Sequence, residues 1–335
     1  MDFLKEIVNE IGDEYTQIAA DIDETERFID TGSYIFNAVV SGSIYGGVSS
    51  NKITAIAGET STGKTYFALA VVKNFLDTNP DGYCLYFDTE AAITKGLLES
   101  RGIDTTRLVV VNVVTIEEFR SKALRAVDIY LKSEEEDRKP CMFVLDSLGM
   151  LSTEKEIRDA LDDKQVRDMT KSQLVKGAFR MLTLKLGQAN IPLIVTNHTY
   201  DVIGSYVPTK EMGGGSGLKY AASTIIYLSK KKEKDKTEVV GNIIKAKTAK
   251  SRLSKENQQV EIRLYYDERG LDRYYGLLEL GELGGLWKNT AGRYEIDGKK
   301  IYAKQIYAEP EKYFTEDVMG KLDEISKKQF SYGTN

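Results

Sequence analysis

The segment GETSTGKT at residues 58–65 restricts the fold of this chain more than any other feature of its sequence. It follows the apolar run ITAIA and precedes YFALAVVKNFL, which has the composition of a helix. That is the context which the pattern G-x-x-x-x-G-K-[ST] requires. The glycines let backbone N–H groups curl around phosphates, and the helix N-terminus adds its positive dipole end. The segment therefore predicts a phosphate-binding loop between a strand and a helix.

All eight residues of this loop are expected to contact the phosphates of a nucleotide. They are Gly58, Glu59, Thr60, Ser61, Thr62, Gly63, Lys64 and Thr65. The Lys64 ammonium is expected to neutralise the β- and γ-phosphates, and the Thr65 hydroxyl to ligate Mg²⁺.

Two further apolar runs end on acidic residues. CMFVLD ends on Asp146, where a carboxylate that orients Mg²⁺ belongs in such a fold. YCLYFDTE ends on Asp88 and Glu90. Because hydrolysis needs a base close to the γ-phosphate, we expect Glu90 to activate water, with Asp88 as the structural alternative.

Apolar runs alternate with helix-like segments from about residue 31 onward, which predicts an α/β fold with a mostly parallel central sheet. Continuous apolar runs indicate strands covered on both faces, and these runs are ITAIAG, YCLYFDTE, RLVVVNVV, CMFVLDS and IPLIVTNH. Later runs without intervening helices suggest antiparallel strands at one edge, with KKKEKDK as a solvated hairpin tip. We expect a core at 31–275 and a small C-terminal α/β subdomain at 276–335, which contains Trp287 and a closing helix near 314–328.

Residues 1–30 are expected to form a short amphipathic helix and an acidic linker. One face carries apolar side chains at helical spacing: Phe3, Leu4, Ile7, Val8, Ile11 and Tyr15. This face must be buried against the core of its own chain or against a neighbouring subunit. We expect the segment to serve as a contact between protomers.

Composition narrows the class of protein further. With 41% hydrophobic and 29% charged residues, the chain is an ordinary globular protein, and its formal net charge of -5 excludes a charge-dominated, histone-like mode of nucleic-acid binding. Cys84 and Cys141 lie in apolar runs and are expected to be buried and free, as in a reducing compartment. With one histidine there is no His-based metal cluster, and no run approaches the about 20 apolar residues of a membrane span. We expect a cytoplasmic location.

The loop, the two acidic strand ends, LIVTNHTYDVIG and MGGGSGLKYAAST together resemble the RecA-type recombinases. The similarity extends from IDTGSYIFNAVVSGSIYGG at 29–47 to GLLELG at 276–281. DSLGMLSTEKEIRDALDDKQVRDMT and the NHTY motif favour the phage branch of that family. The resemblance implies a RecA-like P-loop ATPase core that uses ATP and Mg²⁺.

The resemblance also implies roles for residues outside the loop. His198 corresponds to the polar residue that senses the γ-phosphate, at the end of the strand before the second DNA loop. Lys250 and Arg252 correspond to a basic pair that reaches the neighbouring protomer's ATP, and Lys245 and Lys247 are the alternative pair. The two DNA-binding loops correspond to about 154–175 and 200–219. The candidate DNA contacts in and beside these loops are Arg167, Lys171, Lys176, Arg180, Gly213, Gly214, Gly215, Ser216 and Gly217. Leu97 stands where bacterial members stack adenine on a tyrosine.

By the same resemblance, the chain is expected to form helical filaments on single-stranded DNA, to pair that strand with double-stranded DNA and to exchange strands in recombination and repair. A phage single-strand-binding protein and a recombination mediator are implied as partners, inside an infected bacterial host cell. A ring-forming replicative helicase built on the same core is the alternative. A third hypothesis is a DNA scaffold that binds ATP but hardly hydrolyses it, and the presence of Glu90 and Asp146 argues against it.

Overall fold

A nine-stranded sheet forms the centre of the computed structural model, which describes residues 2–12, 16, 18–21, 27–164, 169–201, 210–213, 216–296 and 298–333. Its strands are β3 (Ile53–Gly58), β4 (Tyr83–Asp88), β5 (Leu108–Asn112), β6 (Cys141–Asp146), β7 (Leu193–Asp201), β8 (Lys210–Met212), β9 (Thr224–Asp235), β10 (Glu238–Ser251) and β11 (Gln259–Tyr265). The order is β11-β10-β9-β3-β7-β6-β4-β5, and β8 pairs with β7. Six strands, from β9 to β5, pair in parallel, whereas β10, β11 and β8 are antiparallel additions. The predicted α/β fold with a mostly parallel sheet is confirmed.

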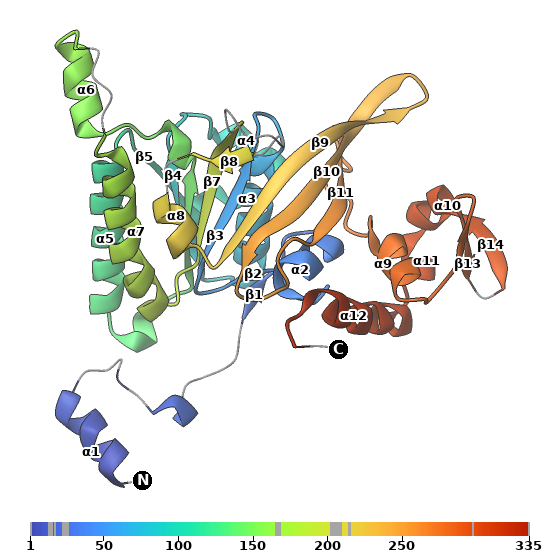
Figure 1. The fold of residues 1–335 in the computed structure, drawn as a ribbon, viewed down its shortest axis with the longest axis horizontal. Helices are drawn as coiled ribbons and strands as arrows, with labels where there is room; N and C mark the ends of the chain where they lie inside the picture. The colour runs from blue at the N-terminus through green and yellow to red at the C-terminus, as the bar shows by residue number, and fades with distance from the viewer. Residues whose placement is uncertain are drawn as a thin grey trace.

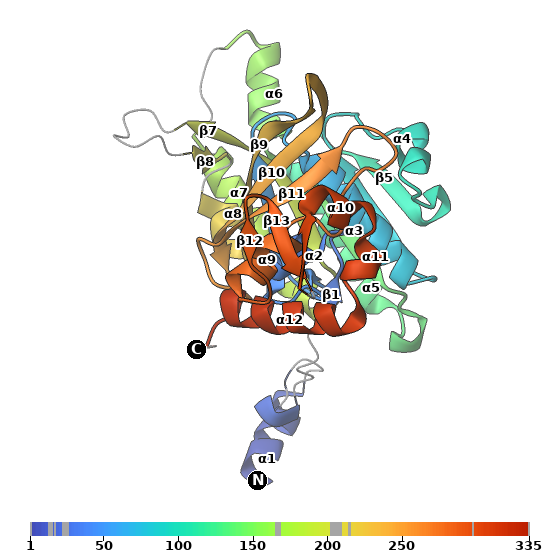
Figure 2. The same ribbon diagram turned by 90° about the vertical axis from the view of Figure 1, so that its right-hand side faces the viewer.

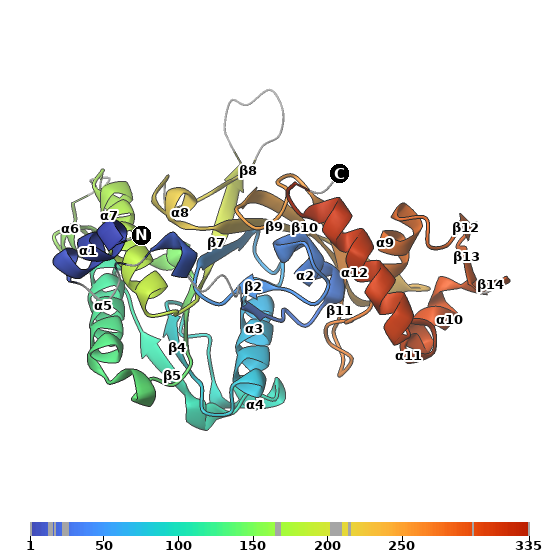
Figure 3. The same ribbon diagram turned by 90° about the horizontal axis from the view of Figure 1, so that it is seen from below.

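Helices cover both faces of this sheet (Figure 1, Figure 3). On one face lie α2 (Tyr34–Ser41), α3 (Lys64–Thr78) and α4 (Lys95–Ser100); on the other lie α5 (Ile116–Lys132), α7 (Lys171–Gln188) and α8 (Ser216–Ala221). Successive side chains of a strand point to opposite faces, so Ile56 of β3 joins the first cluster, and Ala55 and Ala57 join the second. This double burial explains why β3, β4 and β6 have continuous apolar sequences.

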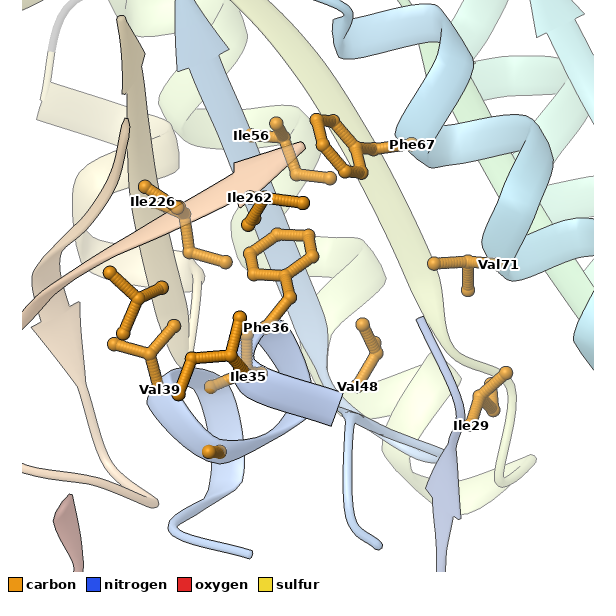
Figure 4. Packing of buried hydrophobic residues seen from close by; sticks show 14 of the residues in the cluster. Ile29, Ile35, Phe36, Val39, Val48, Ile56, Phe67, Val71, Ile226 and Ile262 are labelled. Carbon is orange, nitrogen blue, oxygen red and sulfur yellow. The ribbon is translucent and has the colours of Figure 1, made fainter. Parts of the chain in front are cut away.

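The phosphate-loop helix is fixed by aromatic and aliphatic packing. Phe67 of α3 meets Phe36 of α2 with ring centroids 5.1 Å apart, and Ile56, Ile226 and Ile262 close around them (Figure 4). All five side chains are buried. Burial of side chains of this size contributes about 1.5–3 kcal/mol each, so the start of α3 is held firmly on the sheet.

One strand departs from the predicted burial on both faces. β5 lies at the edge of the sheet, and its Val109 and Val110 side chains are 54% and 39% exposed. The prediction was wrong for this strand because an apolar β-branched run favours extended structure whether or not a second layer covers it.

The lysine-rich segment KKKEKDK also differs from its prediction. Lys230 to Asp235 continue β9 as an exposed ribbon paired with β10, and only Lys236 and Thr237 lie between the two strands. The segment is solvated as expected, but it is strand rather than hairpin tip. Pairing with β10 satisfies backbone groups of this segment, so the lysines extend from a two-stranded arm.

The C-terminal elements pack onto the core beside α2 (Figure 2). They are α9 (Leu277–Leu283), β12 (Asn289–Thr290), β13 (Arg293–Ile296), β14 (Lys299–Tyr302), α10 (Ala303–Ala308), α11 (Pro310–Tyr313) and α12 (Glu316–Phe330). Trp287 is buried in the same apolar cluster as α2 and α3. The Asp323 carboxylate of α12 accepts hydrogen bonds from Ser43 Oγ (2.5 Å) and from the backbone N–H of Ile44 (3.0 Å), just beyond the end of α2.

The N-terminal helix is present as α1 (Asp2–Ile11) and lies apart from the sheet in Figure 1. Its Phe3, Leu4, Ile7 and Ile11 side chains are exposed. Tyr15, the last member of the predicted apolar face, lies outside the described residues. The contact that this face makes with a second protomer stays a prediction.

Candidate functional site

The carboxyl ends of four parallel strands bring the candidate site together. In the ladders, Gly58 of β3 is the partner of His198 in β7, and Asp88 of β4 is the partner of Asp146 in β6. Parallel strands end at the same edge of a sheet, and ligands of open α/β sheets bind there. Predicted site residues 140 positions apart therefore share one edge.

The phosphate loop takes its shape from backbone that only some residues adopt. Gly63 caps α3 with φ +91°, in the left-handed region that glycine adopts without strain. At Gly58, a Cβ would lie 2.7 Å from both the Leu228 carbonyl oxygen and Thr62 Oγ1. Both glycines of the motif are thus required by the conformation of the loop as well as by the approach of phosphates.

Lys64 is buried and bound to the loop itself. Its Nζ donates to the carbonyl oxygens of Gly58 (3.0 Å) and Glu59 (2.9 Å). Desolvation lowers the pKa of the Lys64 ammonium, against the opposing effect of the Asp146 and Glu90 carboxylates. The cation is therefore held over the loop at a cost in hydration, which a bound phosphate would offset.

Asp146 is the most densely hydrogen-bonded carboxylate of the site. Its Oδ2 accepts from Thr65 Oγ1 (2.7 Å) and from the Tyr86 hydroxyl (2.7 Å), and its Oδ1 accepts from Thr196 Oγ1. Burial and the neighbouring Asp146 charge raise the pKa of Tyr86 well above its usual value, so the phenol remains a donor. The adjacent oxygens of Thr65 and Asp146 are hard ligands that suit Mg²⁺ completed by phosphate and water.

The sequence interpretation missed Tyr86 and Thr196. Each is a buried residue with a hydroxyl group, and it lies in its strand two positions before Asp88 or His198 respectively. Residues two apart in a strand face the same side, so this spacing was the available signal.

Glu90 and Asp88 differ in what their carboxylates contact. Asp88 accepts from the backbone N–H groups of Glu90 (3.0 Å) and Ile93 (3.1 Å), so it shapes the turn that follows β4. The Glu90 side chain is 40% exposed, receives Ser147 Oγ at 3.0 Å, and lies 3.6 Å from His198 Nε2. Of the two, Glu90 has the carboxylate that can reach a water molecule.

His198 joins the phosphate edge to the second candidate loop. β7 continues to Asp201, so His198 is not at the end of the strand as expected; the extra residues pair with β8. The Gly213 N–H donates to the His198 carbonyl (3.0 Å), and Asn197 Nδ2 donates to the Gly213 carbonyl (2.8 Å). His198 and Gly213 are thereby connected by a backbone hydrogen bond.

The candidate DNA contacts divide into three groups. Arg167, Gly214 and Gly215 lie outside the described residues. On α7, Lys176 and Arg180 are exposed, Lys176 lies 5.9 Å from the Tyr220 ring centroid, and Lys171 pairs with Glu156 at 3.3 Å. Gly213 borders β8, and Ser216 and Gly217 open α8.

Gly217 has a packing role that the sequence interpretation did not foresee. A Cβ there would lie 2.7 Å from the Lys176 backbone N and Cα atoms, so glycine lets α8 approach α7. The glycine-rich composition of the loop therefore has a structural cause at this position.

The predicted basic pair lies at the end of β10. Lys250 Nζ donates to the carbonyl oxygens of Lys219 (2.7 Å) and Tyr220 (3.2 Å), and burial, followed by the nearby Arg252, lowers the pKa of Lys250. The Arg252 side chain is exposed. Of the alternative pair, Lys245 lies 3.8 Å from Glu261 and Lys247 is exposed.

Leu97 lies on α4, partly buried against the core. Near it, the Arg101 guanidinium lies 4.1 Å from the centroid of the Tyr66 ring, and Tyr66 directly follows the phosphate loop.

The fold and the site define a P-loop nucleotide-binding protein with a parallel α/β core. The model of the RecA N-terminal domain matches residues 2–272. The chain belongs to the RecA family.

Its relatives include a recombination and repair protein of Enterobacteria phage T4 (UvsX), which is 35% identical over 261 residues. That alignment covers 78% of this chain and 65% of the phage protein, so the chain spans slightly less than two thirds of that relative. Protein RecA of Paracoccus denitrificans is 28% identical over 258 residues, covering 76% of this chain and 69% of that protein. Protein RecA of Streptomyces rimosus is 27% identical over 285 residues, covering 84% and 72%. The resemblance to the family and to its phage branch is confirmed.

One of these relatives is named a recombination and repair protein, and the other two are named RecA. None of the three supports the ring-forming helicase. Among the described residues, no helix is both long and apolar enough to cross a membrane.

Proposed function

We propose that this chain is a DNA-dependent ATPase that assembles on single-stranded DNA and catalyses homologous pairing and strand exchange. The observation that carries the proposal is the position of His198, 3.6 Å from Glu90 on one side and bonded through its backbone to Gly213 on the other. His198 thus connects the carboxylate that is proposed to activate water with the candidate DNA loop.

In the proposed mechanism, the phosphate loop binds ATP and Lys64 leaves the Gly58 and Glu59 carbonyls to meet the β- and γ-phosphates. Thr65 and Asp146 would hold Mg²⁺, which would screen the charge of the phosphates. Glu90 orients a water molecule and accepts its proton. His198 donates a hydrogen bond to the γ-phosphate and loses it after cleavage, which changes the position of Gly213.

The proposed active form is an open helical assembly, because a basic pair from one protomer completes the ATP site of the next. We assign this role to Lys250 and Arg252, with Lys245 and Lys247 as the alternative. Single- and double-stranded DNA are the proposed substrates. The proposed contacts are Lys171, Lys176, Arg180, Gly213, Ser216 and Gly217, together with Arg167, Gly214 and Gly215, which lie outside the described residues. A single-strand-binding protein and a recombination mediator are proposed partners.

ATP hydrolysis measured with and without single-stranded DNA, beside a joint-molecule assay, tests this function. We expect DNA to stimulate hydrolysis and joint molecules to form only with ATP. Glu90→Gln should abolish hydrolysis while ATP still binds. A rate of hydrolysis that DNA leaves unchanged would contradict the recombinase, and unwinding of a forked duplex without joint molecules would favour the helicase instead.

His198→Ala tests the coupling separately. We expect this variant to bind ATP, but we expect DNA to stimulate its ATP hydrolysis only weakly. Without the imidazole, residue 198 cannot bond the γ-phosphate, so the presence of that phosphate no longer affects the position of Gly213. His198→Gln keeps a donor and should retain part of the stimulation. Full stimulation of the alanine variant would remove the sensor role.

A further inference from the structure

A lysine outside the motif lies against the phosphate loop, on the flank formed by β9. In the ladder, Leu228 of β9 is the partner of Gly58, so Lys230 lies two residues beyond the level at which β3 opens into the loop. Side chains two apart in a strand share a face, and Leu228 packs in the same cluster as α3. Lys230 therefore extends on the α3 side of the sheet, and its Nζ donates to the Ser61 carbonyl oxygen at 2.7 Å.

Strand order keeps this ammonium apart from the carboxylates that are proposed to act in hydrolysis. β9 flanks β3 on one side, whereas β7, β6 and β4 lie on the other side and carry His198, Asp146 and the turn to Glu90. Within the part of the chain that the structure describes, Lys230 forms no ion pair, and its side chain is exposed. The Ser61 carbonyl is a neutral acceptor. An anionic phosphate oxygen would bind the ammonium more strongly, because both groups are then charged.

Two ammonium groups thus rest on carbonyl oxygens of one loop. Lys64 donates to two of these oxygens and Lys230 to a third. Burial is the largest cause of the lowered pKa of Lys64; the Asp146 and Glu90 carboxylates oppose it, and the positive charge of Lys230 lowers the pKa further. The two cations therefore repel each other, and a polyphosphate on the loop would attract both of them.

We propose that Lys230 is a second cation of the chain's own phosphate site, which exchanges the Ser61 carbonyl for a phosphate oxygen of a nucleoside triphosphate. The contact is made within one chain, whereas Lys250 and Arg252 are proposed to reach the ATP of the next protomer. This inference rests on the proposed function, since it requires that the loop binds ATP. With two cations of its own, the loop holds the nucleotide before a neighbouring protomer supplies its basic pair.

The test measures the affinity of the full chain for a fluorescent, non-hydrolysable ATP analogue in the absence of DNA. Lys230→Gln should weaken binding about tenfold, as expected for the loss of one hydrogen bond to a charged group. Lys230→Arg keeps the charge and should stay within about twofold of the unmodified chain. Lys232→Gln is the matched control, because Lys232 is exposed on the same face, about 7 Å further along β9. It should change the affinity by less than about twofold, since exposed charges are screened over such distances.

Inorganic tripolyphosphate distinguishes a contact with the phosphates from one with the sugar or base. As a competitor of the analogue, it should lose affinity for Lys230→Gln by the same factor as the analogue does. The melting temperature of this variant without nucleotide should equal that of the unmodified chain. Unchanged affinity in Lys230→Gln would overturn the proposal, and so would a loss that the arginine variant shares, a loss confined to the analogue or a lowered melting temperature. If the unmodified chain does not bind the analogue, the proposed function fails instead.

A second measurement needs no variant. The unmodified chain is treated with a lysine-acylating reagent, with and without the ATP analogue, and modification of each lysine is followed by mass spectrometry. The analogue should slow the acylation of Lys230 and leave that of Lys232 unchanged, because only a lysine that contacts the phosphates is protected. Equal rates at Lys230 with and without the analogue would contradict the contact.

Discussion

At the scale of single residues, the phosphate loop contains a cation, Lys64, whose burial is costly. Lys64 has a lowered pKa because it is desolvated, so the unfolded chain binds its proton more tightly than the folded chain does. The buried ammonium therefore lowers the free energy of unfolding at neutral pH. This destabilisation is lost as pH rises from the folded-state pKa of Lys64 through its unfolded-state pKa of about 10.4.

Lys64→Met should accordingly raise the melting temperature of the nucleotide-free protein at pH 7. The gain should shrink as pH approaches 10, and the variant should lose the stabilisation that ATP gives to the unmodified chain. Thermal denaturation at the two pH values, with and without ATP, checks this. A melting temperature that falls at pH 7 would show that the bonds to Gly58 and Glu59 outweigh the desolvation of Lys64.

A second prediction concerns Tyr86, whose buried hydroxyl donates to Asp146. Tyr86→Phe should lower the free energy of unfolding by about 0.5–1.5 kcal/mol, the usual net value of one hydrogen bond. It should also weaken Mg²⁺-dependent ATP binding, since Asp146 becomes less constrained. Tyr45→Phe, at an exposed tyrosine, should change neither quantity in urea denaturation and nucleotide titration. Equal stabilities of the two variants would contradict the role of the bond.

At the scale of elements, α12 attaches the C-terminal part to the core by its polar side as well as its apolar side. Asp323 receives the Ile44 N–H and Ser43 Oγ, and Ser326 Oγ donates to the Gly42 carbonyl at 2.8 Å. The polar groups that follow the end of α2 thus find their hydrogen-bond partners on a helix about 280 residues later in the chain. Such a contact has no signature in the local sequence.

Asp323→Ala should lower the free energy of unfolding by about 1–3 kcal/mol, because it leaves the buried Ile44 N–H without its acceptor. Asp317→Ala on the same helix removes an exposed pair with Lys321 and should cost at most about 0.5 kcal/mol. Urea denaturation of both variants gives the comparison. Similar losses for the two would mean that α12 contributes through its helical charge rather than through the contact with Ile44.

The sequence predicted those elements whose local pattern coincides with their environment. β3, β4 and β6 are mostly apolar and mostly buried, and the motif at 58–65 fixed the turn between β3 and α3. β5 has the same pattern but lies at the edge, which depends on strand order rather than on its residues. The extension of β7 past His198 was also missed, because it depends on pairing with β8.

At the scale of the whole molecule, strand register separates the candidate basic pair from the phosphate loop of the same chain. Lys250 is the partner of Ile225 in β9, which in turn pairs with Ala55 at the third residue of β3. Gly58 lies three residues further along β3, about 10 Å at 3.3 Å per residue. The pair therefore lies toward the opposite edge of the sheet from its own nucleotide site, which is what a group supplied to a neighbour requires.

Mixing two inactive variants tests this arrangement. Lys64→Ala removes the phosphate loop's cation, and Arg252→Ala removes a group offered to the neighbour. In a randomly mixed open assembly, about a quarter of the interfaces combine an intact loop with an intact Arg252, so the mixture should recover about that fraction of the DNA-stimulated ATPase. Each variant alone should remain inactive at the same total concentration. Lys247→Ala mixed in the same way tests the alternative pair, and recovery with that variant alone would transfer the role to Lys245 and Lys247. If neither mixture exceeds its separate components, the ATP site is complete within one chain and the shared site is wrong.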